Sequence, residues 1–471
     1  MTTISTAPAR QFGGWLKYGA VILTTFFVCW AIMIGYWHTT GSNPGTGELA
    51  LTLLALPAAL LLGLWGGRKM VAARATPATA AASKPTPLPA TGTAAAAPAL
   101  AIVATAVRSP YGASAEELAD AIANNEARAD LDKELVDEHG FPVMAARCED
   151  AQDEALQDEI MEWLSGQDMP APHLDEEQWR ALILASGVAA ELASRAAGEL
   201  MPAEGAPPVL QLRLLLPQDW ESLVRRATAK WLTHVVSQYG WPVDKIAVPD
   251  ALEQAQPLTP TALLAQLMPA TPAPPAPLVA MVIACASLIG QESVDRLAAR
   301  SLLFTSSSQV RGQTPGEGAA GLLLADLGQA QLLDHEDFTL LGPIGERHLD
   351  TSADDARRSD ATPLLELAAQ LGKTGAIDLS RISMVVADTG HRSNRVLELM
   401  GLGAPALPQV DASDDIVRIG LGSGSCGAVP VITVLALAQH YARERNAPVL
   451  CVSNEDPFLR GAALVRPTAI P

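Results

Sequence analysis

Cysteine and histidine are the side chains through which this chain could do nucleophilic or metal chemistry. The five cysteines are Cys29, Cys148, Cys285, Cys426 and Cys451. They form no Cys-x-x-Cys pair and no Cys/His cluster with the spacing of a zinc site. We therefore expect no metal site and no disulfide framework, and we expect a reducing compartment.

Two side chains are candidates for catalysis if the protein is an enzyme. Cys426 lies in the Gly-rich segment GSGSCG, which lacks the Lys-Ser/Thr ending of a phosphate-binding loop. Its thiol could react, but a free cysteine more often packs, and no base accompanies it. His391 follows Gly390 and could rescue a site, or it could be exposed or cap a turn. Glu317 is expected to hold a turn by hydrogen bonds rather than to transfer protons.

The composition excludes one class of partner. The chain has 51 acidic and 32 basic residues, a formal charge of −19, and a hydrophobic fraction of 49%. It has no run of Lys and Arg of the kind that holds a phosphate backbone, so we expect no nucleic-acid partner. The acidic runs at 149–159 and 174–177 are interpreted as solvated helix faces. Nothing in the sequence indicates a cofactor.

Short apolar runs alternate with helical patterns from residue 99 onward. Strands are predicted at residues 100–107, 209–216, 278–287, 321–326, 382–387, 416–421 and 449–453. Helices are predicted at 220–239, at 431–444, and after Ser114, where Glu117 three residues on completes a capping box. Continuous apolar strands alternating with helices indicate an α/β fold whose sheet is buried on both faces.

Two uncharged stretches, Tyr18 to Trp37 and Leu49 to Trp65, precede this region. About 20 apolar residues cross a hydrocarbon core, and the second stretch is at the short end of that range, so a buried helix is its alternative. The first is too long for a signal peptide and has no small-residue cleavage site after it. The sequence therefore predicts a cytoplasmic tail at 1–16 and a two-helix transmembrane hairpin at 17–67.

Charge predicts the orientation of this hairpin. The loop from His38 to Glu48 has no Lys or Arg, whereas Arg10, Lys17, Arg68 and Lys69 flank the two helices. The positive-inside rule then places both ends in the cytoplasm, as in a multi-pass protein of the cell inner membrane. An Ala/Pro-rich linker at 68–98 would tether a cytoplasmic domain at 99–471 to the membrane.

Five segments, in order, resemble the β-ketoacyl synthases of the thiolase-like superfamily. They are LAIVATAVRSPYGASAEEL (100–118), the segment 282–320 that ends in PGEGAA, MVVADTGHRSNRVLE (384–398), GSGSCGAVPVITVLAL (422–437) and CVSNEDPFLRGAALV (451–465). The resemblance covers about residues 99–471. It implies a thiolase-like layered αβαβα domain with two related halves, approximately 99–350 and 360–471.

The resemblance also implies where a catalytic Cys-His-His set would lie. The family's nucleophile lies upstream of the strand at 278–287, yet no cysteine occurs between Cys148 and Cys285, and Cys285 is inside the strand. The family's first histidine falls at Asp388 and its second near Gly424. All three positions depart from the family, although a cleft for an acyl chain could persist as an apolar groove.

We therefore expect a membrane-anchored, non-catalytic thiolase-like protein that acts as an adaptor or scaffold for another protein. Its layout resembles the type VI secretion lipase-adaptor proteins, which implies a lipase effector as partner. The alternative is a divergent β-ketoacyl synthase or acyltransferase that acts on acyl thioesters through Cys426 or His391. A membrane sensor is disfavoured because the outer loop is short and Gly-rich. By resemblance, the domain would form a homodimer.

The predicted hairpin can be tested by cysteine labelling. In a chain carrying Ser42→Cys, a membrane-impermeant maleimide should label the loop from the outer side of intact cells. Labelling of this position from the cytoplasmic side alone would contradict the predicted topology.

Overall fold

The computed structural model describes residues 98–202, 204–249, 258–269, 276–333, 338–355 and 358–468. The predicted tail, transmembrane hairpin and linker lie outside the described residues, apart from Pro98. Within the described part, one helix, α6 (Glu176–Glu199), is long and apolar enough to cross a membrane. Because 61% of its apolar window is buried inside the domain, we assign α6 to the core.

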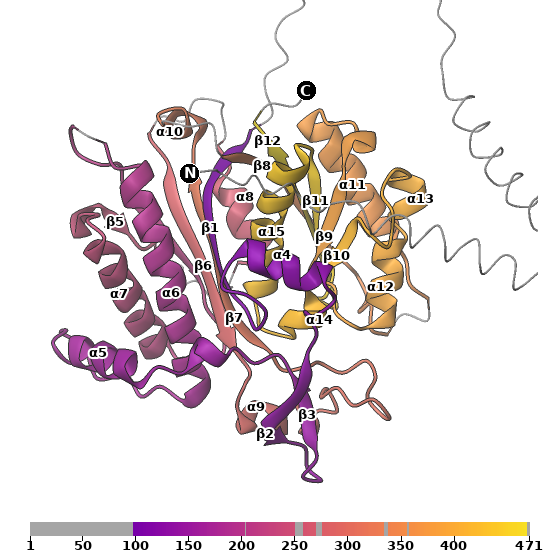
Figure 1. Cartoon of the computed structure of the whole chain (residues 1–471), viewed down its shortest axis with the longest axis horizontal. Coiled ribbons are helices and arrows are strands. Elements are labelled where there is room, and N and C mark those ends of the chain that lie inside the picture. The colour runs from indigo at the N-terminus through magenta and orange to yellow at the C-terminus, as the bar shows by residue number, and fades with distance from the viewer. Residues whose placement is uncertain are drawn as a thin grey trace, which may run out of the picture. The chain divides into compact units, whose positions relative to one another are not determined.

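The described strands form one ten-stranded sheet and a separate hairpin (Figure 1). The first half contributes β1 (Leu100–Arg108), β4 (Leu210–Leu215), β5 (Ile246–Ala247), β6 (Val279–Ser287) and β7 (Glu317–Ala325). The second half contributes β8 (Thr339–His348), β9 (Met384–Ala387), β10 (Ile416–Arg418), β11 (Val449–Ser453) and β12 (Leu459–Pro467). The hairpin consists of β2 (Asp130–Val136) and β3 (Pro142–Ala145).

The two halves repeat one topology. The order across the sheet is β10-β9-β11-β12-β8-β1-β7-β6-β4-β5, so in each half the strands, counted along the chain, run 3-2-4-5-1 from the outer edge. In both halves strand 5 is antiparallel to its two neighbours, while the other pairs are parallel. Antiparallel pairing of Leu100–Ile102 with Thr339–Leu341 joins the halves.

The repeated order places the division between the halves earlier than expected. We predicted it between residues 350 and 360, but β8 pairs with β12 along most of its length and is therefore the first strand of the second half. The division precedes Thr339. The stretch between His348 and Thr362 therefore connects β8 to the helix that begins at Thr362, inside the second half.

Helices cover both faces of each half-sheet. Those of the first half are α4 (Ala115–Ala123), α5 (Glu154–Ser165), α6, α7 (Ser222–Gln238), α8 (Pro260–Leu267), α9 (Gln291–Ala299) and α10 (Leu327–Ala330). Those of the second half are α11 (Thr362–Gly375), α12 (Ser393–Met400), α13 (Gly403–Ala406), α14 (Gly420–Ser423) and α15 (Val429–Arg445).

Three hydrophobic cores lie between these layers of helices and strands. One core joins α6 and α7 to the outer face of the first half-sheet, and another joins α11 and α12 to the outer face of the second. The third core contains α15, α8 and α4 between the two half-sheets, and α15 contacts strands of both (Figure 1). The order α-β-α-β-α follows, and β6 and β7 are buried along their whole length, as predicted for a sheet covered on both faces.

Local signals account for several of the element boundaries. The Ser114 side chain accepts a hydrogen bond from Glu117 N–H and starts α4, as the sequence predicted. The strand predicted at 416–421 ends at Arg418, because the chain turns into α14 at Gly420. A Cβ at Gly420 would lie 2.3 Å from the Asp388 carbonyl oxygen, so only glycine permits this close turn.

Because α15 belongs to the core between the half-sheets, we expect the halves to unfold together. Leu437, fully buried on α15, should cost about 2–5 kcal/mol of unfolding free energy when replaced by alanine. The described tryptophans all lie in the first half, so their fluorescence reports on that half. Leu437→Ala should shift the tryptophan transition in denaturant together with loss of amide protection in β11. The exposed Leu397→Ala is the control, and a shift confined to the second half would contradict the prediction.

Candidate functional site

The positions expected for a catalytic set lie at the ends of elements that border the central layer. Asp388 directly follows β9, and Gly424 lies between α14 and α15. The helix upstream of β6, where the resembled family carries its nucleophile, is α8.

The start of α8 holds a threonine in place of a thiol. Thr259 is the N-cap residue: its Oγ1 accepts a hydrogen bond from Ala262 N–H at 3.0 Å. The same hydroxyl donates to Glu346 Oε2 at 2.6 Å. The Thr259 side chain therefore connects the start of α8 to β8.

Asp388 faces the turn between β11 and β12. Its side chain is 5% exposed and accepts hydrogen bonds from Ser453 Oγ at 2.5 Å, Asn454 N–H at 2.8 Å and Glu455 N–H at 3.3 Å. Burial raises the pKa of Asp388 to about 6 and the Glu455 charge adds to the rise, while the three hydrogen bonds oppose it. The carboxyl group holds the β11–β12 turn in place.

An ionic network extends from this turn. Glu455 accepts hydrogen bonds from Gly390 N–H at 3.0 Å and from Arg392 Nε at 2.8 Å. Asp354 pairs with Arg392 at 3.2 Å and with the buried Arg395 at 2.8 Å. These contacts fasten the loop after β9 to the turn and to the segment around Asp354.

A second buried pair lies beside this network. Arg460 and Glu398 pair at 2.5 Å, and both side chains are at most 4% exposed. Asn454, in the β11–β12 turn, connects the turn to α12 and to the loop after β9. Its side chain donates to the Arg395 carbonyl and accepts from the Thr389 hydroxyl. A buried ion whose partner is removed destabilises a fold strongly, so Arg460 and Glu398 each depend on the other.

His391 lies at the edge of this network. It is half-buried, and its ring packs edge-on against Phe304 with 4.5 Å between ring centroids. Burial lowers the pKa of His391, so the ring is neutral at pH 7. Among the described residues its Nε2 has no hydrogen-bond partner.

Cys426 is enclosed by the protein. The residue is 1% exposed and packs in the core between the half-sheets, and its thiol donates to the Ser423 carbonyl at 3.5 Å. Burial raises the pKa of Cys426 to about 12, with a smaller contribution from the Glu317 charge, so the thiolate is not formed at neutral pH. In the part of the chain that is described, no hydrogen bond joins Cys426 to His391 or to any other base, so the structure does not bring the two candidates together.

Gly424 leaves no room for a side chain. Its φ of +59° is in the region that favours glycine, and a Cβ would lie 2.8 Å from the Thr314 carbonyl oxygen and 2.9 Å from that of Pro315. Ser425 N–H donates to the Thr314 carbonyl at 2.8 Å and holds the two segments together. A histidine at this position would require the Gly-rich turn to move away from the PGEG segment.

Glu317, at the first position of β7, makes hydrogen bonds as expected, but its partners lie in three other segments and not in its own turn. Its Oε1 accepts from Arg180 at 2.6 Å and from Cys148 N–H at 2.7 Å. Its Oε2 accepts from Arg180 at 2.8 Å and from the Ser287 hydroxyl at 2.9 Å. Sequence reasoning missed Arg180, which is 2% exposed and more than a hundred residues upstream, and no local pattern pairs the two.

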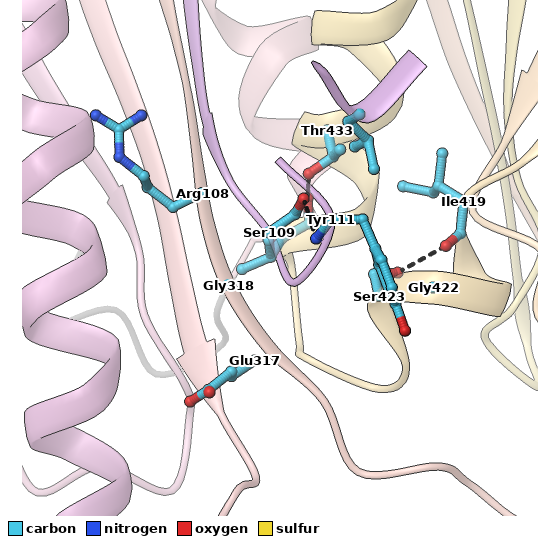
Figure 2. A pocket seen from close by; sticks show the side chains of 11 residues that line it. Arg108, Ser109, Tyr111, Glu317, Gly318, Ile419, Gly422, Ser423 and Thr433 are labelled. Carbon is cyan, nitrogen blue, oxygen red and sulfur yellow. Dashed lines mark hydrogen bonds between the residues drawn. The ribbon is translucent and has the colours of Figure 1, made fainter. Parts of the chain in front are cut away.

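The cavity beside these residues is small. It has a volume of about 10 Å³ and is lined by Ser109, Tyr111, Glu317, Ser423 and Thr433 among others (Figure 2). That is about the space of one water molecule. A larger open hollow of about 500 Å³ lies at the opposite end of α15, beside His440 and Asn446. Neither of these two cavities is a deep apolar groove at the expected site.

No metal centre is apparent in the described part of the chain. No group of three or more His, Cys, Asp or Glu side chains is placed to hold an ion. What the described residues bring together at the expected site is a set of ion pairs and main-chain contacts.

The raised pKa of Asp388 predicts a pH dependence of stability. The pKa of Asp388 in the folded state lies above the ordinary value of 3.8, so the fold favours the neutral acid. The stabilisation by the neutral acid is complete below pH 3.8, and it is lost as the pH rises through about 6. Asp388→Asn should therefore gain up to about 3 kcal/mol relative to wild type between about pH 4 and about pH 8, measured by denaturant unfolding.

The control for this measurement is Asp411→Asn. Asp411 is exposed, and hydrogen bonds from Ser413 lower its pKa. Its contribution to stability is therefore lost as the pH falls, which is the opposite of the dependence expected for Asp388. An unchanged difference between Asp388→Asn and wild type across this range would show that Asp388 ionises freely in the folded protein.

Comparison with known proteins identifies the fold. No protein-family model matches the sequence, and no curated protein matches it. Among solved structures, the chain is similar to the ketosynthase from module 6 of the bacillaene synthase from Bacillus subtilis 168, with 14% identity and a TM-score of 0.53 over 79% of this chain and 72% of that one. It is also similar to a chain of the AntDE:AntF assembly, a type II polyketide synthase acyl-carrier protein in complex with its ketosynthase, with 12% identity and a TM-score of 0.51 over 79% of this chain and 99% of that one. The described domain therefore has the thiolase-like fold of the ketosynthases.

Proposed function

We propose that this protein is a non-catalytic member of the thiolase-like fold that binds another protein and holds it at a membrane. The observation that carries the proposal is the state of the two positions expected for histidines. Asp388 is a buried carboxyl group committed to the β11–β12 turn, and Gly424 is packed against main chain. A negative charge at position 388 would oppose the oxyanion that a histidine stabilises during condensation.

The burial of the cysteines in the described part of the chain also supports the proposal. The described cysteines, Cys148, Cys285, Cys426 and Cys451, are all buried. Burial raises the pKa of each of them, which keeps them as thiols. Thr259 at the start of α8 is a poor substitute for a thiol, because the carboxylate of Glu346, to which its hydroxyl donates, is a weak base compared with the alkoxide that deprotonation would create.

The finer part of the proposal concerns the partner and the place. The two uncharged stretches at 18–37 and 49–65 support anchoring in the inner membrane with the domain in the cytoplasm. The layout resembles lipase adaptors of type VI secretion, so we propose a secreted lipase effector as the bound protein. The homodimer that the resemblance implies remains a prediction.

One experiment separates the adaptor from an enzyme. The full-length protein and a Cys426→Ala/His391→Ala variant would be incubated with labelled acyl-carrier protein and acyl-coenzyme A, with an active ketosynthase as positive control. In parallel, proteins cross-linked to each form at the membrane would be recovered and identified. We expect no acyl-enzyme in either form and the same partners with both.

An acyl-enzyme that forms in wild type and is lost in the double variant would establish the alternative, a divergent ketosynthase or acyltransferase that acts on acyl thioesters. Recovery of a lipase with both forms would support the secretion adaptor. Recovery of a different protein would leave the adaptor role and overturn the lipase.

A further inference from the structure

The β2–β3 hairpin projects from the first half (Figure 1). Its strands carry both buried and exposed apolar residues. On the inner face, Leu135, Val143 and Ala145 form a small core with α9 and with Leu303. This inner face anchors the hairpin to the domain, so its second face keeps a defined shape.

The second face is open to solvent. Leu131 pairs with Met144 and Val136 pairs with Pro142, and directly opposite residues of an antiparallel pair share a face. Leu131 is 59% exposed and Val136 is 36% exposed, and Phe141 in the connecting turn is 65% exposed. We call these five residues the hairpin face. Exposed apolar side chains that gather on one rigid surface mark an interaction site.

The hairpin is bonded to other segments at the end of β2 and just beyond β3. The Gln291 side-chain amide accepts from Val136 N–H at 3.2 Å and donates to the Val136 carbonyl at 2.9 Å, as a neighbouring strand would. Beyond β3, Ala146 pairs with Gly316 in parallel. A partner therefore cannot add a strand at these points, and the side chains of the hairpin face are left for contact.

Charge selects the kind of partner. The hairpin carries the exposed acids Asp130, Glu134 and Glu138 and the half-buried Asp137, against the exposed Lys133. Arg147 balances part of this charge through Asp132 at 2.8 Å and Glu134 at 3.1 Å. A second copy would bring two acidic hairpins together, and an anionic membrane would be repelled, whereas Lys and Arg beside an apolar stripe would be attracted.

We infer that the hairpin face is the docking surface for one amphipathic helix of the bound protein, a helix whose apolar stripe is flanked by Lys and Arg. This inference rests on the proposed adaptor function and names the surface through which it acts. A helix fits because its apolar residues at i, i+3, i+4 and i+7 can lie across the side chains of two short strands.

The test uses the full-length chain in nanodiscs with Phe141 replaced by the photoreactive benzoylphenylalanine, which keeps an exposed aromatic group at this position. The probe is a fluorescent amphipathic helical peptide of leucine and lysine. Control peptides have the same composition in shuffled order, or glutamate in place of lysine. The matched control chain carries the photoreactive residue at Leu332, which is 74% exposed on another part of the domain.

We expect covalent adducts at position 141 with the leucine–lysine helix, and at least about tenfold fewer at position 332 or with either control peptide. Adding Leu131→Ser to the position-141 chain should lower the adduct about tenfold, whereas adding Leu397→Ser, at a 63% exposed site on α12, should not. Equal yields at positions 141 and 332, insensitivity to Leu131→Ser, or equal yields with the glutamate peptide would overturn the inference.

A second readout separates this inference from the proposed function. If Leu131→Ser abolishes recovery of the cross-linked partner at the membrane and Leu397→Ser does not, both stand. If Leu131→Ser leaves partner recovery unchanged, the hairpin face is not the docking surface and the adaptor function stands. If the peptide adduct forms while wild type recovers no partner, the surface is supported and the adaptor function is overturned.

Discussion

Burial of α15 between the two half-sheets is the constraint on which the rest of this structure depends. Twelve of its residues are buried, and they are distributed around the helix, so no face of it could be left in water. The helix needs a sheet on each side, and the repeated 3-2-4-5-1 strand order supplies them. The turn that leads into α15 must then pass between other segments of main chain, which is why glycine occupies position 424.

The same constraint affects the packing at the site expected in this fold. In a condensing enzyme, the ends of the central helices border a cleft that holds a thioester. Here those ends are closed by contacts that serve stability: the Gly-rich turn lies on the PGEG segment, and Thr259 bonds to Glu346. The cavity beside them has the volume of about one water molecule. A side chain at position 424 would require main chain to move.

The charged groups near the expected site hold the fold together. Asp388 holds the β11–β12 turn, Glu455 and Asp354 hold loops together through Arg392 and Arg395, and Glu317 accepts four hydrogen bonds from Arg180, Cys148 and Ser287. Each carboxyl group is matched by a guanidinium or by N–H and O–H donors, as burial requires. These groups are therefore committed to the fold.

The sequence by itself determined the apolar strands, the start of α4 at Ser114, the position of α15 and the departures from the family at Asp388 and Gly424, because periodicity, capping and residue type are local properties of the chain. It did not determine the β2–β3 hairpin, whose short strands carry a mixed pattern, or the division before Thr339, which depends on which strand β8 pairs with. It also could not decide whether Cys426 and His391 meet, or that Arg180 pairs with Glu317. Those outcomes depend on distances between segments far apart in the chain, and only the packing of two half-sheets around one apolar helix fixes such distances.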